Sequence, residues 1–160
     1  MTTSITYIVE HPPLQHILLF KDSSQNILYS TKLERHSFHR NKTHLYRGPA
    51  DTGTHIATLE NPEHIRLDTG VEIVVERPRG FRGTRSFDFG GSEYKWIGQS
   101  KVTDATGKTV AEYRPKLWSF KVMGQLSVMD VDVETLEVII ATFVALLGEH
   151  SKDENEGAGG

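Results

Sequence analysis

The sequence contains no cysteine, which excludes a disulfide scaffold, a thiolate zinc site and a cysteine nucleophile. It also lacks an overall excess of positive charge, because 18 Lys and Arg residues stand against 21 Asp and Glu residues, for a net charge of -3. A chain with this balance has no global field that attracts nucleic acid. Any attraction to anions must therefore come from local basic segments.

Motifs of the common enzyme classes are missing as well. There is no Gly-x-Ser-x-Gly turn, no phosphate-binding loop and no dinucleotide fingerprint. His36, His39 and His44 do not form a familiar metal-binding pattern, because histidines three apart point to opposite faces of a strand and no cysteine or nearby carboxylate completes the spacing. We therefore expect a binding protein without a metal or cofactor. An enzyme would need a pocket of convergent polar groups, which no motif predicts.

No segment has the properties of a secretory signal or a transmembrane helix. The start, MTTSITYIVEHPP, lacks a basic segment and a continuous apolar segment. The apolar run from Val138 to Leu147 is much shorter than the roughly 20 residues that cross a bilayer. We expect a cytoplasmic or nuclear protein whose contact with membranes, if any, is peripheral.

Apolar and polar residues alternate along most of the chain, which predicts short β-strands. Clusters of Gly, Pro, Asp, Asn and Ser separate the strands and favour turns. Gly90 and Gly91 predict one hairpin, Asp104 and Gly107 predict another, and Gly124 predicts a bulge or bend. The predicted strands cover residues 5–9, 16–20, 27–31, 43–47, 55–60, 64–68, 71–76, 86–89, 93–98, 101–104, 108–114 and 118–131, the last range as one strand or a pair.

Residues 133–147 predict a single buried α-helix. Asp132 is a suitable N-cap and Gly148 a suitable C-terminal stop. Within residues 138–147 only Thr142 is polar, so the helix has no face for solvent and belongs in the core. A barrel of about eight strands has room mainly for its own side chains, whereas one of about eleven strands can surround a helix.

We therefore expect a mainly β fold, a closed antiparallel barrel of about 12 strands around a central hydrophobic C-terminal α-helix. Residues 1–149 would form this single domain, and residues 150–160 would form a disordered polar tail. Trp96 and Trp118 alternate with polar neighbours in predicted strands, so both are predicted to be core residues.

Three segments carry a resemblance to a known fold: SFDFGGSEYKWIG at 86–98, VTDATGKTVAEYRP at 102–115 and GQLSVMDVDVETLEVIIATFVALLGE at 124–149. In these segments the chain resembles an uncharacterised fungal family of the tubby C-terminal-like fold, which tubby proteins, phospholipid scramblases and LURP-one-related proteins share. The resemblance implies a closed barrel threaded by the C-terminal helix. It also suggests contact with lipids or phosphoinositides.

Two segments, residues 32–47 and 77–85, are rich in positive charge and suit an anionic ligand. Arginine forks match phosphate oxygens, and an aromatic ring can stack on a base or enter a headgroup layer. If the segments lie together, we expect these residues to form an anion site: Arg35, Arg40, Lys42, Arg47, Arg77, Arg79, Phe81, Arg82 and Arg85. The alternative is that both segments are solvated loops whose arginines pair with nearby carboxylates.

The sequence thus predicts a non-enzymatic intracellular module that binds anionic lipid headgroups or other phosphate ligands through basic loops. Its partner would be an anionic membrane surface or a phosphoinositide. The alternative is a protein-interaction scaffold, with a protein partner and no lipid or nucleic-acid binding. Single-stranded nucleic acid is less favoured as a ligand because the net charge is negative.

Overall fold

The structure, a computed structural model, describes residues 4–12, 17–35, 41–61, 63–76, 83–117, 119 and 121–158. These residues form twelve β-strands followed by one α-helix, α1 (Val133–Ala158). The strands are β1 (Ser4–Glu10), β2 (Leu19–Lys21), β3 (Ile27–Glu34), β4 (Lys42–Arg47), β5 (Thr54–Asn61), β6 (His64–Leu67), β7 (Glu72–Val74), β8 (Thr84–Phe89), β9 (Ser92–Ile97), β10 (Lys101–Thr103), β11 (Thr109–Pro115) and β12 (Val122–Met129). The predicted fold class is confirmed.

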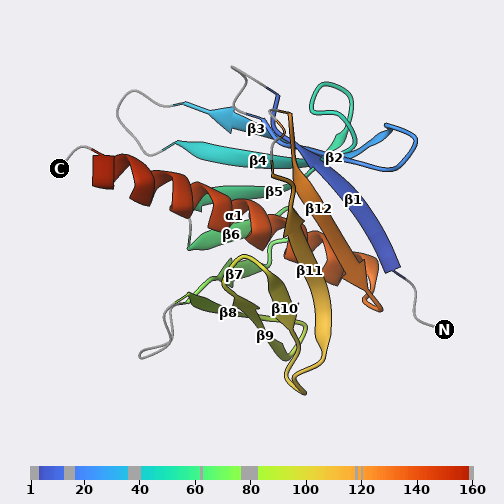
Figure 1. Ribbon diagram of the computed structural model, residues 1–160. Coiled ribbons are helices and arrows are strands. Elements are labelled where there is room, and N and C mark those ends of the chain that lie inside the picture. Colours follow the sequence, from blue (N-terminus) through green and yellow to red (C-terminus); the bar gives the residue numbers. More distant parts are fainter. Residues whose placement is uncertain are drawn as a thin grey trace.

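The strands form one antiparallel sheet that curls into a nearly closed barrel. Their order is β7-β6-β5-β4-β3-β2-β1-β12-β11-β10-β9-β8, so β1 and β12 pair although they lie far apart in the chain. Among the described residues, the outer strands β7 and β8 are joined by one bridge, in which Glu76 and Ser86 exchange backbone hydrogen bonds of 2.8 and 2.9 Å. Helix α1 runs through the space that the strands enclose (Figure 1).

Helix α1 fits inside the barrel because its middle turns are apolar on every side. The side chains of residues 138–146 are all buried. Thr142 donates a hydrogen bond to the carbonyl oxygen of Ile139 at 2.9 Å and accepts one from the indole Nε1–H of Trp96 at 2.7 Å. The predicted core position of Trp96 is confirmed, and its hydrogen bond connects strand β9 to the helix.

Local sequence signals explain how several elements begin and turn. The Oδ1 atom of Asp132 accepts a hydrogen bond from the backbone N–H of Thr135 at 2.8 Å, which confirms Asp132 as the N-cap. Gly90–Gly91 forms the β8–β9 turn, with φ values of 62° and 80° that favour glycine. At Gly124 a Cβ atom would lie 2.3 Å from the carbonyl oxygen of Arg114, and the β1–β12 register shifts directly beside it. The predicted bulge is confirmed.

The structure differs from the sequence prediction mainly in where elements start and end. Strand β2 begins at Leu19 rather than at residue 16, and β12 begins at Val122 rather than at residue 118. Helix α1 continues through Gly148 into the segment predicted to be a polar tail, which contains Glu and Lys residues of high helix propensity. Trp118 lies outside the described residues. Across the described part of the chain, no helix combines the length and apolarity needed to cross a membrane.

Candidate functional site

The up-and-down order of the strands sorts their connections into two ends of the barrel. Residues 22–26, 48–53, 68–71, 90–91, 104–108 and 130–132 connect elements at the end where α1 begins, and residues 11–18, 35–41, 62–63, 75–83, 98–100 and 116–121 connect strands at the opposite end. In sequence, the first set contains six Asp and one Lys, whereas the second contains seven Arg or Lys and two Glu. We call these the acidic end and the basic end.

The charged residues at each end are spread over several connections. The acidic end has Asp22, Asp51, Asp68, Asp104, Asp130, Asp132 and Lys108. Among the described residues, the basic end has Arg35, Lys116, Lys121, Glu63 and Glu76; the other basic residues of its connecting segments, Arg40, Arg77, Arg79 and Arg82, lie outside the described residues.

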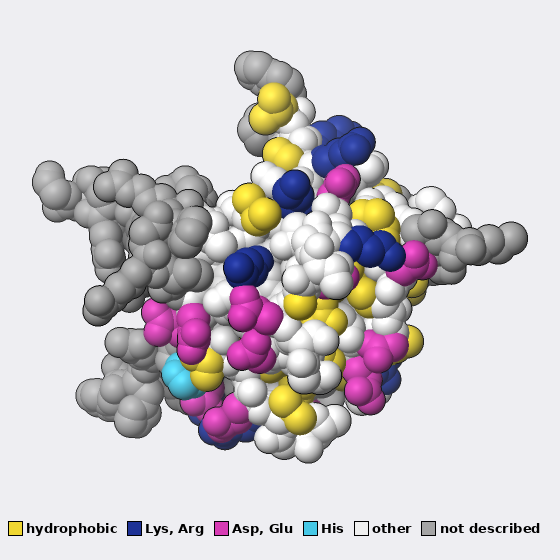
Figure 2. Space-filling view, turned by 90° about the horizontal axis from the view of Figure 1, so that it is seen from below, with side chains coloured by type: hydrophobic (Ala, Val, Ile, Leu, Met, Phe, Trp, Pro, Cys, Tyr) yellow, Lys and Arg dark blue, Asp and Glu magenta, His cyan; other side chains and the backbone are white. Residues whose placement is uncertain are grey.

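At the basic end, two lysines flank an exposed leucine in the β11–β12 connection. The side chain of Leu117 is 74% exposed, the highest value among the large exposed hydrophobic residues that the structure describes. Lys116 directly precedes it, and Lys121 directly precedes β12. Figure 2 shows the barrel from one side, with Lys and Arg side chains mainly in the upper part and Asp and Glu mainly in the lower part; this division runs across the barrel and not from one end to the other. The sequence prediction missed this lysine pair because it assigned most of the segment to a strand.

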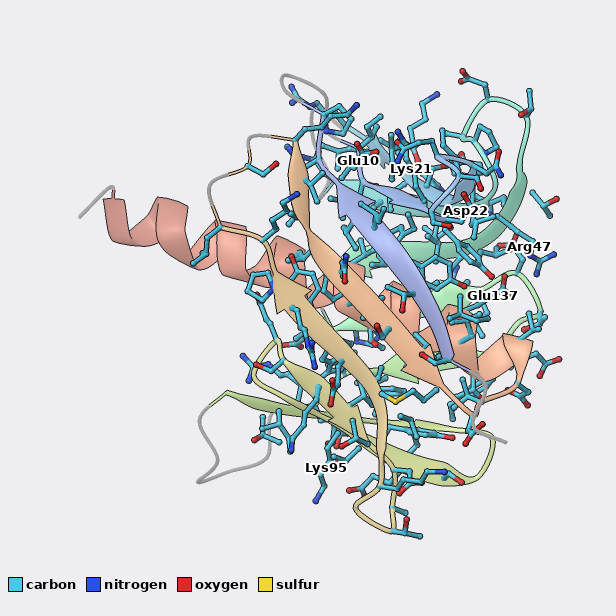
Figure 3. The ribbon with its side chains drawn as sticks, turned by 45° about the vertical axis from the view of Figure 1, so that its right-hand side comes forward. Glu10, Lys21, Asp22, Arg47, Lys95 and Glu137 are labelled. Atoms are coloured by element: carbon cyan, nitrogen blue, oxygen red, sulfur yellow. The ribbon has the colours of Figure 1, made fainter. Side chains whose placement is uncertain are left out.

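Glu10 holds two lysines near the basic end. Its side chain is buried, with Lys21 Nζ 2.5 Å from Oε2 and Lys121 Nζ 3.4 Å from Oε1. Glu10 and Lys21 lie next to each other in Figure 3. Burial alone would raise the pKa of Glu10, but the contacts with Lys21 and Lys121 outweigh burial and lower the pKa below the ordinary value of 4.5.

The residues predicted to bind an anion do not all lie together. Arg35, Lys42 and Arg85 are at or near the basic end, where Arg35 is exposed and the other two are half-buried. Arg47 is five residues beyond Lys42 on β4, which places it about 17 Å away, toward the acidic end. The remaining candidates lie outside the described residues, as do His36 and His39: Arg40, Arg77, Arg79, Phe81 and Arg82.

Arg47 is bound to the helix. Its Nε and Nη2 atoms donate hydrogen bonds to Glu137 Oε2 and Oε1 at 2.9 and 2.8 Å, and Figure 3 shows the two side chains directed at each other. The Tyr29 hydroxyl also donates to Glu137, and burial followed by the Glu137 charge raises the pKa of Tyr29. The same two causes raise the pKa of Tyr7 to about 12. This cluster fastens β4 to α1 and leaves the Arg47 guanidinium engaged.

A pocket of about 310 Å³ lies beside this cluster, at the acidic end. Val71, just before β7, and Phe89, at the end of β8, both line it. The pocket therefore occupies the part of the β7–β8 seam that lies away from the Glu76–Ser86 bridge. Its other lining residues are Arg47, Thr54, His55, Ile56, Ala57, Leu67, Asp68, Thr69, Glu134 and Glu137.

Two histidines beside the pocket form a chain of polar contacts between two carboxylates. His44 Nε2 lies 2.5 Å from Glu34 Oε2, His44 Nδ1 lies 2.8 Å from His55 Nε2, and His55 Nδ1 lies 2.7 Å from Asp68 Oδ2. Because all four ring nitrogens are engaged, neither imidazole has a nitrogen free to act on a ligand.

A β-bulge places His55 next to His44. The register between β4 and β5 shifts after Leu45, where Leu45 pairs with Ala57 but Tyr46 pairs with His55. Ile56 is the extra residue, and without it His55 would point to the barrel interior because side chains alternate between faces. In the described ranges, no group of three or more His, Asp or Glu side chains is arranged to hold a metal ion.

Comparison with known proteins gives one match. Residues 12–151 match a family of unknown function, DUF6593. No curated protein matches the chain, and no solved structure matches it.

Proposed function

The chain belongs to the DUF6593 family, and we propose that it is a non-enzymatic intracellular module whose basic end binds anionic phosphate groups, chiefly those of lipid headgroups. The observation that carries this proposal is the opposite charge of the two ends of one barrel. In sequence, the segments that join the strands at one end hold seven Arg or Lys and two Glu, and those at the other end hold six Asp and one Lys; of the seven basic residues, the structure describes Arg35, Lys116 and Lys121. Such a molecule turns its basic end toward an anionic surface although its net charge is negative.

The apolar residues of the basic end support a membrane rather than a dissolved anion as the main partner. Leu117 is 74% exposed, and in the sequence it lies between Lys116 and Lys121 in the β11–β12 connection. A lysine or arginine close to an anionic membrane contributes about 1 kcal/mol, and apolar side chains add to the affinity when they enter the interface. The lone buried carboxylate of this end, Glu10, is already paired with lysines and adds little repulsion.

We further propose that the barrel is related to the tubby C-terminal-like fold through a fungal family of that fold. Twelve strands around a C-terminal helix support the relationship, as do the Phe87-x-Phe89 and Tyr94-x-Trp96 strands. The relationship is one of fold and carries no ligand by itself. The proposed ligand rests on the basic end.

The proposal is tested by flotation of the purified full-length chain with lipid vesicles. One set contains phosphatidylcholine alone, and the others add phosphatidylserine or a phosphatidylinositol phosphate. We expect binding only to the anionic vesicles, with weaker binding at physiological than at low salt. A soluble inositol phosphate is added as a competitor, since displacement at low concentrations would identify a headgroup site and not a general attraction to the surface.

Two lysines provide a matched pair of variants. Lys116→Glu at the basic end and Lys108→Glu at the acidic end change the net charge equally. We expect about a tenfold loss of binding for Lys116→Glu and no loss for Lys108→Glu. Reversing Arg79, Arg82 and Arg85 together should weaken binding by at least about 100-fold.

Equal losses for the two lysine variants would contradict the proposal, because net charge alone would then explain the binding. Absence of binding to any anionic vesicle would also contradict it. The second outcome would favour the protein-interaction scaffold, in which the basic connections are ordinary solvated loops.

A further inference from the structure

We propose that the pocket at the acidic end binds a small apolar molecule that carries a positively charged ammonium group. This site lies at the opposite end of the barrel from the proposed membrane face, so it would be a second, independent binding site. Its volume of about 310 Å³ is at the lower end of the range for small-molecule pockets. A ligand with a short apolar body fits that volume.

The walls of the pocket account for the apolar part of the ligand. Five apolar side chains line it, from β5, β6, the β6–β7 connection and β8: Ile56, Ala57, Leu67, Val71 and Phe89. Val71 is exposed although it is apolar, as exposed apolar residues often are at a ligand-binding surface. The walls would be covered when an apolar ligand enters.

The acidic groups that line the pocket are the reason to expect a positive charge on the ligand. Asp68, Glu134 and Glu137 contribute three carboxylates, and Arg47 is bound in a two-pronged contact to Glu137. Asp68 accepts a hydrogen bond from His55, and Glu137 is bound to Arg47. Glu134 is thus the one lining acid whose carboxylate has no hydrogen bond or ion pair to another described residue. A cation at the mouth therefore meets an unpaired carboxylate.

The charge of the residues around the pocket also favours a positively charged ligand. The acidic end carries six Asp and one Lys in its connections, so an anionic ligand would be repelled as it approached. Phe89 is half-buried in the lining and presents an aromatic ring to a bound cation. The ring nitrogens of His55, the histidine that lines the pocket, contact His44 and Asp68, so this imidazole offers no free nitrogen to the ligand.

The test uses three probes that share one alkyl chain: hexylammonium, hexanol and hexanoate. An alkylamine is charged at pH 7, as the lysine side chain is. Each probe is titrated into the ¹⁵N-labelled full-length chain without lipid, and amide chemical shifts are followed by NMR. We expect saturable shifts centred on Val71 and Phe89, with affinity decreasing from hexylammonium to hexanol to hexanoate.

Three variants sharpen the test. Glu134→Gln should weaken hexylammonium about two- to fivefold and leave hexanol unchanged, whereas Glu112→Gln on β11 should change neither. Val71→Trp, at an exposed position, should block all three probes. The proposal would be overturned if hexanoate bound as tightly as hexylammonium, if Glu134→Gln had no effect on hexylammonium, or if the shifts were centred away from the seam. Because no vesicle is present, these results do not depend on the basic end.

Discussion

Replacing Thr142 with valine tests how the barrel holds its helix. The two residues have nearly the same shape, but valine cannot accept the hydrogen bond from Trp96 Nε1, which is 2.7 Å from Thr142 Oγ1. Both side chains are 0% exposed, so water cannot replace the lost acceptor. An unsatisfied buried donor costs about 1–3 kcal/mol, and the added methyl group regains at most about 0.8 kcal/mol. We therefore expect a loss of about 1–2 kcal/mol in the free energy of unfolding.

The assay is urea unfolding followed by circular dichroism. With a urea slope of about 2 kcal/mol/M, the midpoint should fall by about 0.5–1 M. Thr142→Ser keeps the hydroxyl that accepts the hydrogen bond and removes the methyl group, so it measures the contribution of methyl packing at this site separately. The decisive comparison is Thr142→Val in a Trp96→Phe background, where no indole N–H remains and the valine should cost nothing. Equal costs in the two backgrounds would refute the reasoning, because the hydrogen bond would then contribute nothing measurable.

Three further substitutions have calculable effects on stability. Gly124→Ala should cost about 1–3 kcal/mol in urea unfolding, because the new Cβ would lie 2.3 Å from a backbone oxygen, and a change under 0.5 kcal/mol would contradict the close approach. Glu10→Gln should cost about 3 kcal/mol at neutral pH, since half-buried Lys21 loses its partner. Folding lowers the pKa of Glu10, so the carboxylate contributes fully to the free energy of unfolding above pH 4.5 and loses this contribution as the pH falls through the folded pKa. The wild type and Glu10→Gln should therefore become equally stable below that pKa in an acid titration. Asp132→Ala should lower the free energy of unfolding by about 1 kcal/mol by removing the cap on the Thr135 N–H, and an unchanged melting temperature would argue against this cap.

Much of the fold could be predicted because its signals are local. Alternation marks each strand, and the β10–β11 turn shows how a turn is defined by a few residues: Asp104 Oδ1 accepts from the backbone N–H groups of Thr106 and Lys108, and Gly107 has a φ of 87°. The apolar stretch of α1 could be recognised as buried because it has no face for water. The end of the helix was harder to predict, since a single glycine weakens a helix without ending it.

The candidate site depends on non-local geometry, so the sequence predicted only part of it. Lys42 and Arg47 belong to one basic segment of the sequence, but they are the first and last residues of β4. They therefore lie at opposite ends of the barrel. The contact between His44 and His55 depends on a one-residue bulge that no pattern in the sequence predicts. The pocket requires a seam between β7 and β8, which is known only once the whole sheet has closed.

The most direct test of the proposed function asks which end of the barrel meets the membrane. Since the chain has no cysteine, Leu117→Cys and Asp51→Cys each introduce one labelling site, at the basic and the acidic end respectively. Each variant carries a polarity-sensitive fluorophore and is mixed with anionic vesicles that contain a lipid-attached quencher. The account predicts a blue shift and quenching for the label at position 117 and no change at position 51. Quenching at position 51, or equal responses at both positions, would contradict it.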